Sequence, residues 1–142
     1  MRSLLDVNVL IALLDADHAS HEHARQWFNR TARAGWASCP LTQNGCVRIM
    51  SHPRYPSPVS VRDGIERLRD AAASSHHEFW PDDVTLLDER VADAARIHGP
   101  RQLTDLYLLA LAVRHDGRLV TFDRAIAVSA ILGASDKHLL AL

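Results

Sequence analysis

Three aspartates could do metal chemistry if the fold brings them together. Asp6 lies between two strongly apolar runs, Asp123 follows an apolar stretch, and Asp105 begins the most apolar segment of the chain. Clustered carboxylates repel one another unless a cation neutralises them, and a donor set made only of oxygens suits Mg²⁺ or Mn²⁺. Such a cation can activate water and offset charge on a phosphodiester. The three aspartates are therefore candidate metal ligands.

Each aspartate also has a plainer interpretation as a helix N-cap. Aspartate is a preferred N-cap residue and favours the positive end of the helix dipole. A buried, unpaired Asp6 would cost several kcal/mol, so it needs a cap, a cation or a metal as its partner. Three aspartates opening three largely apolar helices are less easily explained by capping alone. Asn8 could bond back to the turn that carries Asp6, or bind a water.

Short apolar strands that alternate with helices predict the elements that position these residues. The pattern predicts one α/β domain over residues 1–142, with a central, mainly parallel sheet flanked by helices. Ligands bind beyond the carboxyl ends of strands in such sheets, where Asp6 and Asp123 fall. We expect strands at residues 4–7, 36–39, 78–80, 118–122 and 138–140, and helices at residues 9–14, 21–34, 43–50, 61–73, 88–98, 104–113 and 125–128.

Composition narrows the class of protein. The 142 residues suffice for one hydrophobic core, and no apolar run approaches the roughly 20 residues that span a bilayer. The acidic residues near the N-terminus do not fit a signal peptide, so we expect a cytoplasmic protein without a membrane partner. The net charge of −1 excludes a global basic field, so any RNA contact must be local. The nearest basic candidates are Arg48, Arg54, Arg101 and Arg124.

Four segments in order resemble the successive motifs of the PIN domain, in particular the VapC toxins of bacterial toxin–antitoxin pairs. These are residues 6–10 (DVNVL), 42–48 (TQNGCVR), 104–105 (TD) with the helix that follows, and 121–124 (TFDR). The similarity covers essentially the whole chain. It implies a Mg²⁺-dependent endoribonuclease, with Mn²⁺ as a possible substitute, that cuts cellular RNA through metal-activated water. It also implies a VapB-like antitoxin as partner and a homodimer.

The resemblance also assigns roles to residues. Asp6 and Asp105 match the metal-coordinating aspartates, Asp123 matches a further acid, and Thr121 matches a polar residue that supports the site. Gln43 stands where the family usually has Glu. A neutral amide cannot act as a general base and removes one charge, so we expect one metal held by Asp6, Asp105 and Asp123 and a weakened second site. The candidates for contacts with substrate are Asn8, Arg48 and Arg124.

Two other classes of function compete with this interpretation. A phosphotransferase of the haloacid dehalogenase type would need a second aspartate where this chain has Asn8, and a mid-chain lysine where Lys137 is the only lysine. A non-catalytic PIN-like module that binds RNA or a partner is the closer alternative, because Gln43 is the kind of change that degraded sites show. The retention of all three aspartates favours an enzyme.

Overall fold

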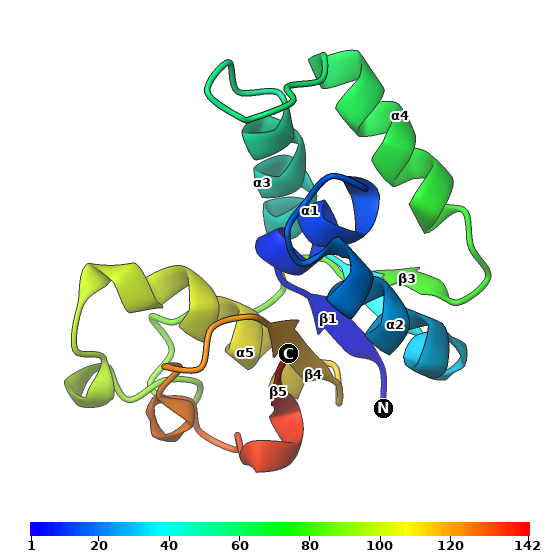
Figure 1. Cartoon of the computed structure of the whole chain (residues 1–142). Coiled ribbons are helices and arrows are strands. Elements are labelled where there is room, and N and C mark those ends of the chain that lie inside the picture. Colours follow the sequence, from blue (N-terminus) through cyan, green and yellow to red (C-terminus); the bar gives the residue numbers. More distant parts are fainter.

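A five-stranded parallel sheet forms the centre of the molecule. A computed structural model describes all of residues 1–142. The strand order is β3-β2-β1-β4-β5, with every neighbouring pair parallel (Figure 1). The predicted α/β domain with a parallel sheet is confirmed. The strands are β1 (Ser3–Leu5), β2 (Trp36–Ser38), β3 (His77–Phe79), β4 (Arg118–Thr121) and β5 (Leu139–Ala141).

Five α-helices flank the sheet. They are α1 (Val7–Leu14), α2 (His21–Thr31), α3 (Pro40–Met50), α4 (Val61–Ala72) and α5 (Leu103–Arg114). Helix α3 begins earlier than expected, because Pro40 occupies its first turn and Cys39, not Thr42, is its N-cap. Proline suits that position, where its missing N–H has no helical partner to lose. No helix is long and apolar enough to cross a membrane.

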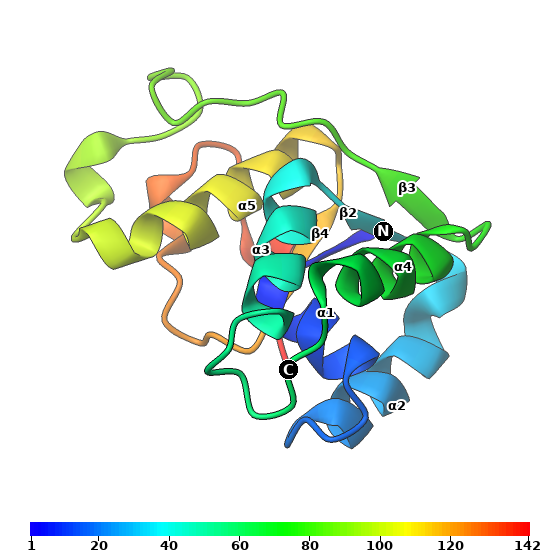
Figure 2. The same ribbon diagram turned by 90° about the horizontal axis from the view of Figure 1, so that it is seen from above.

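The two faces of the sheet carry separate hydrophobic cores. Leu4 of β1 packs among the leucines of α5, whereas the next residue, Leu5, packs against Val9 and Met50 on the opposite face. Side chains alternate in direction along a strand, so one short buried strand supplies both cores. Figures 1 and 2 show the consequence: α5 covers one face, and α1 to α4 gather on the other.

Two predicted helices are absent. The predicted helix at residues 125–128 is replaced by a 3₁₀ helix that begins only at its last residue (Val128–Ala130). Residues 88–98 form turns and a short 3₁₀ helix, Ala94–Arg96. Backbone groups of this segment form hydrogen bonds with residues 130–132 in place of helical hydrogen bonds. Asp93 N–H donates to Ala130 O at 2.9 Å, and Leu132 N–H donates to Val91 O at 2.9 Å. These bonds accompany an antiparallel bridge between Ala92 and Ile131. The contact with a distant segment therefore overrides the helical spacing of the apolar residues.

Candidate active site

Asp6 joins the end of β1 to the start of α1. It is the N-cap of α1, and its Oδ1 accepts the backbone N–H of Val7 at 2.7 Å. Its Oδ2 accepts the hydroxyl of Thr121, at the end of β4, at 2.8 Å. The residue is 7% exposed, so capping is part of its environment but does not offset all of the burial. A buried carboxylate at the carboxyl edge of a parallel sheet is where this fold places a ligand.

Thr121 links Asp6 to Asp123. The fully buried Thr121 hydroxyl donates to Asp6 and accepts the backbone N–H of Asp123 at 3.0 Å. The Asp123 side chain is exposed, and its Oδ1 accepts the N–H of Ala125 at 2.8 Å. Thus the predicted supporting role of Thr121 has a clear geometric basis: one hydroxyl fixes both carboxylate-bearing turns.

Asp105 lies in the first turn of α5, close enough to Asp6 and Asp123 for their charges to act on its carboxyl group. Burial raises its pKa to about 6, and the negative charges of Asp6 and Asp123 add to the rise. Burial also raises the pKa of Asp6, against the bonds from Thr121 and Val7, and the charge of Asp123 raises it further. The structure therefore brings together three carboxylates from remote parts of the chain, and their charges repel one another.

A surface hollow, called here the acidic hollow, opens beside Asp6 and Asp105, whereas Asp123 does not line it. Asp6 and Asp105 line it together with the two predicted substrate contacts Asn8 and Arg48. Gly45 lines it from α3, and a Cβ at Gly45 would lie 2.9 Å from Cγ2 of Val7. The glycine thus lets α3 pack closely against the start of α1. Of the remaining basic candidates, neither Arg101 nor Arg124 lines the hollow.

Asp82 is a further acid of this hollow that the motifs did not identify. It follows β3 by three residues and lines the hollow with Asp6 and Asp105. A signal was present in the sequence, because the third predicted strand, at residues 78–80, is followed by Pro81 and an acidic pair, Asp82 and Asp83. The carboxyl ends of parallel strands share one edge of the sheet, so an acid after β3 belongs with the acid after β1.

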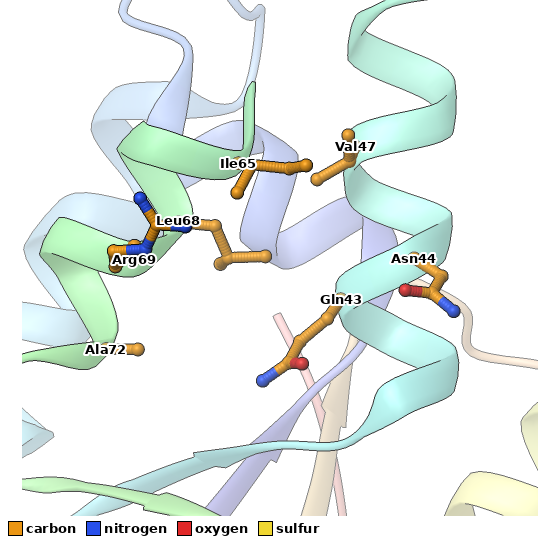
Figure 3. Close-up of a pocket in the computed structure, with 7 residues that line it drawn as sticks. All are labelled: Gln43, Asn44, Val47, Ile65, Leu68, Arg69 and Ala72. Carbon is orange, nitrogen blue, oxygen red and sulfur yellow. The ribbon is translucent and has the colours of Figure 1, made fainter. Parts of the chain in front are cut away.

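Gln43 lies outside the acidic hollow. Its Nε2 donates to Oγ of Ser38 at 2.9 Å, and the same oxygen is 2.8 Å from Nε2 of His77. The side chain lines a different hollow between α3 and α4, where Figure 3 shows it extending toward the α4 side, with Val47, Ile65 and other apolar side chains nearby. This position gives no support to the expectation that its missing charge weakens a metal site.

The donor chemistry of the three aspartates fits a hard divalent cation. All the donors are oxygens. Burial is the main cause of the raised pKa values of Asp6 and Asp105, and a cation would relieve the charge repulsion that adds to it. As they stand, however, no three His, Cys, Asp or Glu side chains form a group that could hold a metal ion. The aspartates are close enough to perturb one another but are not a preformed ligand cage.

Comparison with known proteins identifies the family. Residues 3–131 match the PIN domain. Ribonuclease VapC44 of Mycobacterium tuberculosis is 57% identical over 142 residues, which is 100% of both chains. Ribonuclease VapC39 of the same organism is 46% identical over 135 residues, covering 94% of this chain and 96% of its own.

Solved structures share the fold at low sequence identity. The crystal structure of M. tuberculosis VapC20, a Sarcin-Ricin loop cleaving toxin, has a TM-score of 0.62 at 11% identity, covering 92% of this chain and 96% of that one. VapBC2 from Rickettsia felis, bound to a DNA fragment from its promoter, has a TM-score of 0.53 at 15% identity, covering 87% and 89%. The match to the PIN domain and the 57% identity to ribonuclease VapC44 show that the chain belongs to the PIN-domain family, within its VapC ribonuclease group.

Proposed function

We propose that this protein is a Mg²⁺-dependent endoribonuclease and the toxin of a toxin–antitoxin pair, with residues 1–142 acting as one nuclease unit. One observation carries the proposal: Asp6, Asp105 and Asp123 converge at the carboxyl edge of the sheet in a chain that belongs to the VapC ribonucleases. Mn²⁺ can substitute for Mg²⁺, because both prefer oxygen ligands. RNA as the substrate class is supported by relatives that are named as ribonucleases.

Asp6, Asp105 and Asp123 would hold the cation. A bound Mg²⁺ would supply a more acidic water and offset charge on the phosphodiester. Thr121 and the N–H of Val7 hold the two oxygens of Asp6, so its carboxylate is ordered before a cation binds. Thr121 is thus a positioning residue. Asp105, whose pKa is raised to about 6, must lose its proton before it can bind a cation.

Residues beside the carboxylates bind the substrate. Arg48 and Asn8 line the acidic hollow, so a phosphate placed there can reach the Arg48 guanidinium and the Asn8 amide. Arg124 is exposed next to Asp123, and its Nη2 lies 3.5 Å from Leu142 O, which leaves most of its donors available. We assign it a peripheral contact with the RNA backbone, because it does not line the hollow.

The partner would be a VapB-like antitoxin. The Rickettsia felis VapBC2 structure contains both components of such a pair, which supports this assignment. We further propose a cytoplasmic homodimer as the working form. Growth arrest on expression, relieved either by co-expression of a VapB-like antitoxin or by Asp6→Asn, would distinguish a toxin from a housekeeping nuclease.

Cleavage of RNA by the purified protein tests the activity. Total RNA, with tRNA included, is incubated with Mg²⁺ or Mn²⁺, and parallel reactions contain EDTA or the Asp6→Asn variant. We expect discrete products that need the metal and a rate roughly 100-fold lower in the variant. Absence of any metal-dependent product would favour the second candidate, a non-catalytic PIN-like module that binds RNA or a partner. The lack of a preformed group of metal ligands is the observation behind that candidate.

A further inference from the structure

A second hollow continues from the acidic hollow along α3. The two share Arg48 and Ile49, and the second is completed by His52, Arg54, Tyr55 and Pro56 from the loop after α3. Gly45, Arg48 and Ile49 follow at spacings of three and four residues, so they form one face of the helix. This face leads from the carboxylates to the loop. We call Arg48, His52, Arg54 and Tyr55 the basic edge.

The arginines of the basic edge have no acidic partner. Neither Arg48 nor Arg54 lies within ion-pair distance of a carboxylate, and no aspartate or glutamate lines the second hollow. Six other arginines do pair with acids: Arg2, Arg25, Arg62, Arg90, Arg96 and Arg114. The side chains of Arg48 and Arg54 are both exposed. The edge is therefore locally cationic on a protein whose net charge is −1.

The loop that carries the edge is held in place. Tyr55 N–H donates to His52 O at 2.9 Å, and Val59 N–H donates to Met50 O at 3.0 Å. The Tyr55 hydroxyl donates to the Asp15 carboxylate at the end of α1, which fixes the ring. Nδ1 of His52 accepts the N–H of Arg54 at 3.0 Å, so the ring proton lies on Nε2, available as a donor. A ligand would meet these groups already ordered.

We propose that the basic edge binds the RNA strand on one side of the phosphate held in the acidic hollow. Arg48 and Arg54 contact successive phosphates, His52 Nε2–H donates to a phosphate or sugar oxygen, and an unpaired base rests against Tyr55. This inference rests on the proposed ribonuclease function. Cations interleaved with an aromatic ring suit single-stranded RNA, whose bases are free to stack. An acidic segment of a protein is the competing ligand.

Binding of a labelled RNA in EDTA tests the proposal without any cleavage. The probe is a fluorescein-labelled single strand of about ten nucleotides, followed by anisotropy at several salt concentrations. We expect Arg48→Gln and Arg54→Gln each to raise Kd about 3- to 10-fold and to reduce the slope of log K against log salt by about 1. Arg62→Gln is the matched control, because Arg62 pairs with Glu66 on α4, and it should bind RNA as the unaltered protein does.

Three outcomes would overturn the proposal. The first is that Arg48→Gln and Arg54→Gln both bind the RNA with unchanged affinity and salt slope. The second is that Arg62→Gln loses as much affinity as they do. The third is that polyglutamate of equal charge binds as tightly as the RNA and depends equally on Arg54. Cleavage kinetics supply a separate readout: Arg54→Gln should raise KM about 3- to 10-fold with little change in kcat. Failure to cleave would count against the ribonuclease function, whereas unaltered binding would count against the edge.

Discussion

The hydroxyl of Thr121 lies 2.8 Å from Oδ2 of Asp6, and it accepts the backbone N–H of Asp123 at 3.0 Å. These two bonds tie the end of β1 to the residues that follow β4. Because Thr121 is fully buried, no water can replace the hydroxyl in either bond. The orientation of the central carboxylate thus depends on a residue that itself does not contact the proposed cation.

Thr121→Val should test this dependence, because valine has nearly the same shape and neither donates nor accepts. We expect the free energy of unfolding to fall by about 1–3 kcal/mol as the N–H of Asp123 loses its acceptor. Cleavage should slow by roughly 10- to 100-fold, as for partners that orient metal ligands. Thr121→Ser keeps the hydroxyl and should cleave within about 3-fold of the unaltered protein. A valine variant as active as the serine variant would show that the hydroxyl does not position Asp6.

The raised pKa values of Asp6 and Asp105 predict a pH-dependent loss of stability in EDTA. In the unfolded chain both carboxyls ionise near 3.8, whereas the folded protein retains the Asp105 proton to about pH 6. Between these two pH values the folded protein binds more protons than the unfolded chain does. The free energy of unfolding therefore falls as pH rises from about 4 to about 6. Unfolding midpoints of the unaltered protein and Asp105→Asn, measured from about pH 4 to 7, should show the unaltered protein losing stability relative to the variant.

Added Mg²⁺ should reverse that loss. A cation that binds only the folded, ionised site stabilises the protein, and the rise in the unfolding midpoint should be larger at about pH 7 than at about pH 5. The Asp6→Asn variant provides the control, and all buffers are free of Ca²⁺ so that Mg²⁺ is the only divalent cation present. An equal rise at both pH values, or the same rise in the variant, would place the cation elsewhere on the protein.

Asp82→Asn should weaken cation binding without unfolding the protein. Asp82 is exposed in the acidic hollow, and its charge adds to the negative potential at Asp6 and Asp105. We expect Mn²⁺ affinity, measured by calorimetry, to fall about 3- to 10-fold. Asp83→Asn is the matched control, because the neighbouring carboxylate does not line this hollow and instead lies 2.9 Å from Nε2 of His115. Equal effects of the two changes would mean that Asp82 acts only through net charge.

The sequence predicted the parallel sheet and the convergence of the three aspartates, because local signals determine both. Apolar runs such as residues 4–5 and 119–120 become buried strands, and an acid directly after such a strand falls at the ligand-binding edge. The helix over residues 88–98 failed because its backbone pairs with residues 130–132, a contact that no local pattern reveals. The sequence could not show where the Gln43 side chain points, for a different reason. Consecutive residues on a helix point about 100° apart, so a motif that matches at Gln43 does not show whether Gln43, Asn44 or Gly45 faces the hollow.

The position of Gln43 yields the last prediction. Its amide bonds to Ser38, which in turn bonds to His77, and none of these residues lines the acidic hollow. Gln43→Glu should therefore leave both Mn²⁺ affinity and cleavage rate within about 2-fold of the unaltered protein. Asn44→Asp is the comparison, because Asn44 does line the hollow, and its new charge should tighten Mn²⁺ binding about 3- to 10-fold. If Gln43→Glu instead tightened binding more than Asn44→Asp, the glutamine would occupy the position of a lost metal ligand, and a weakened second site would explain the result.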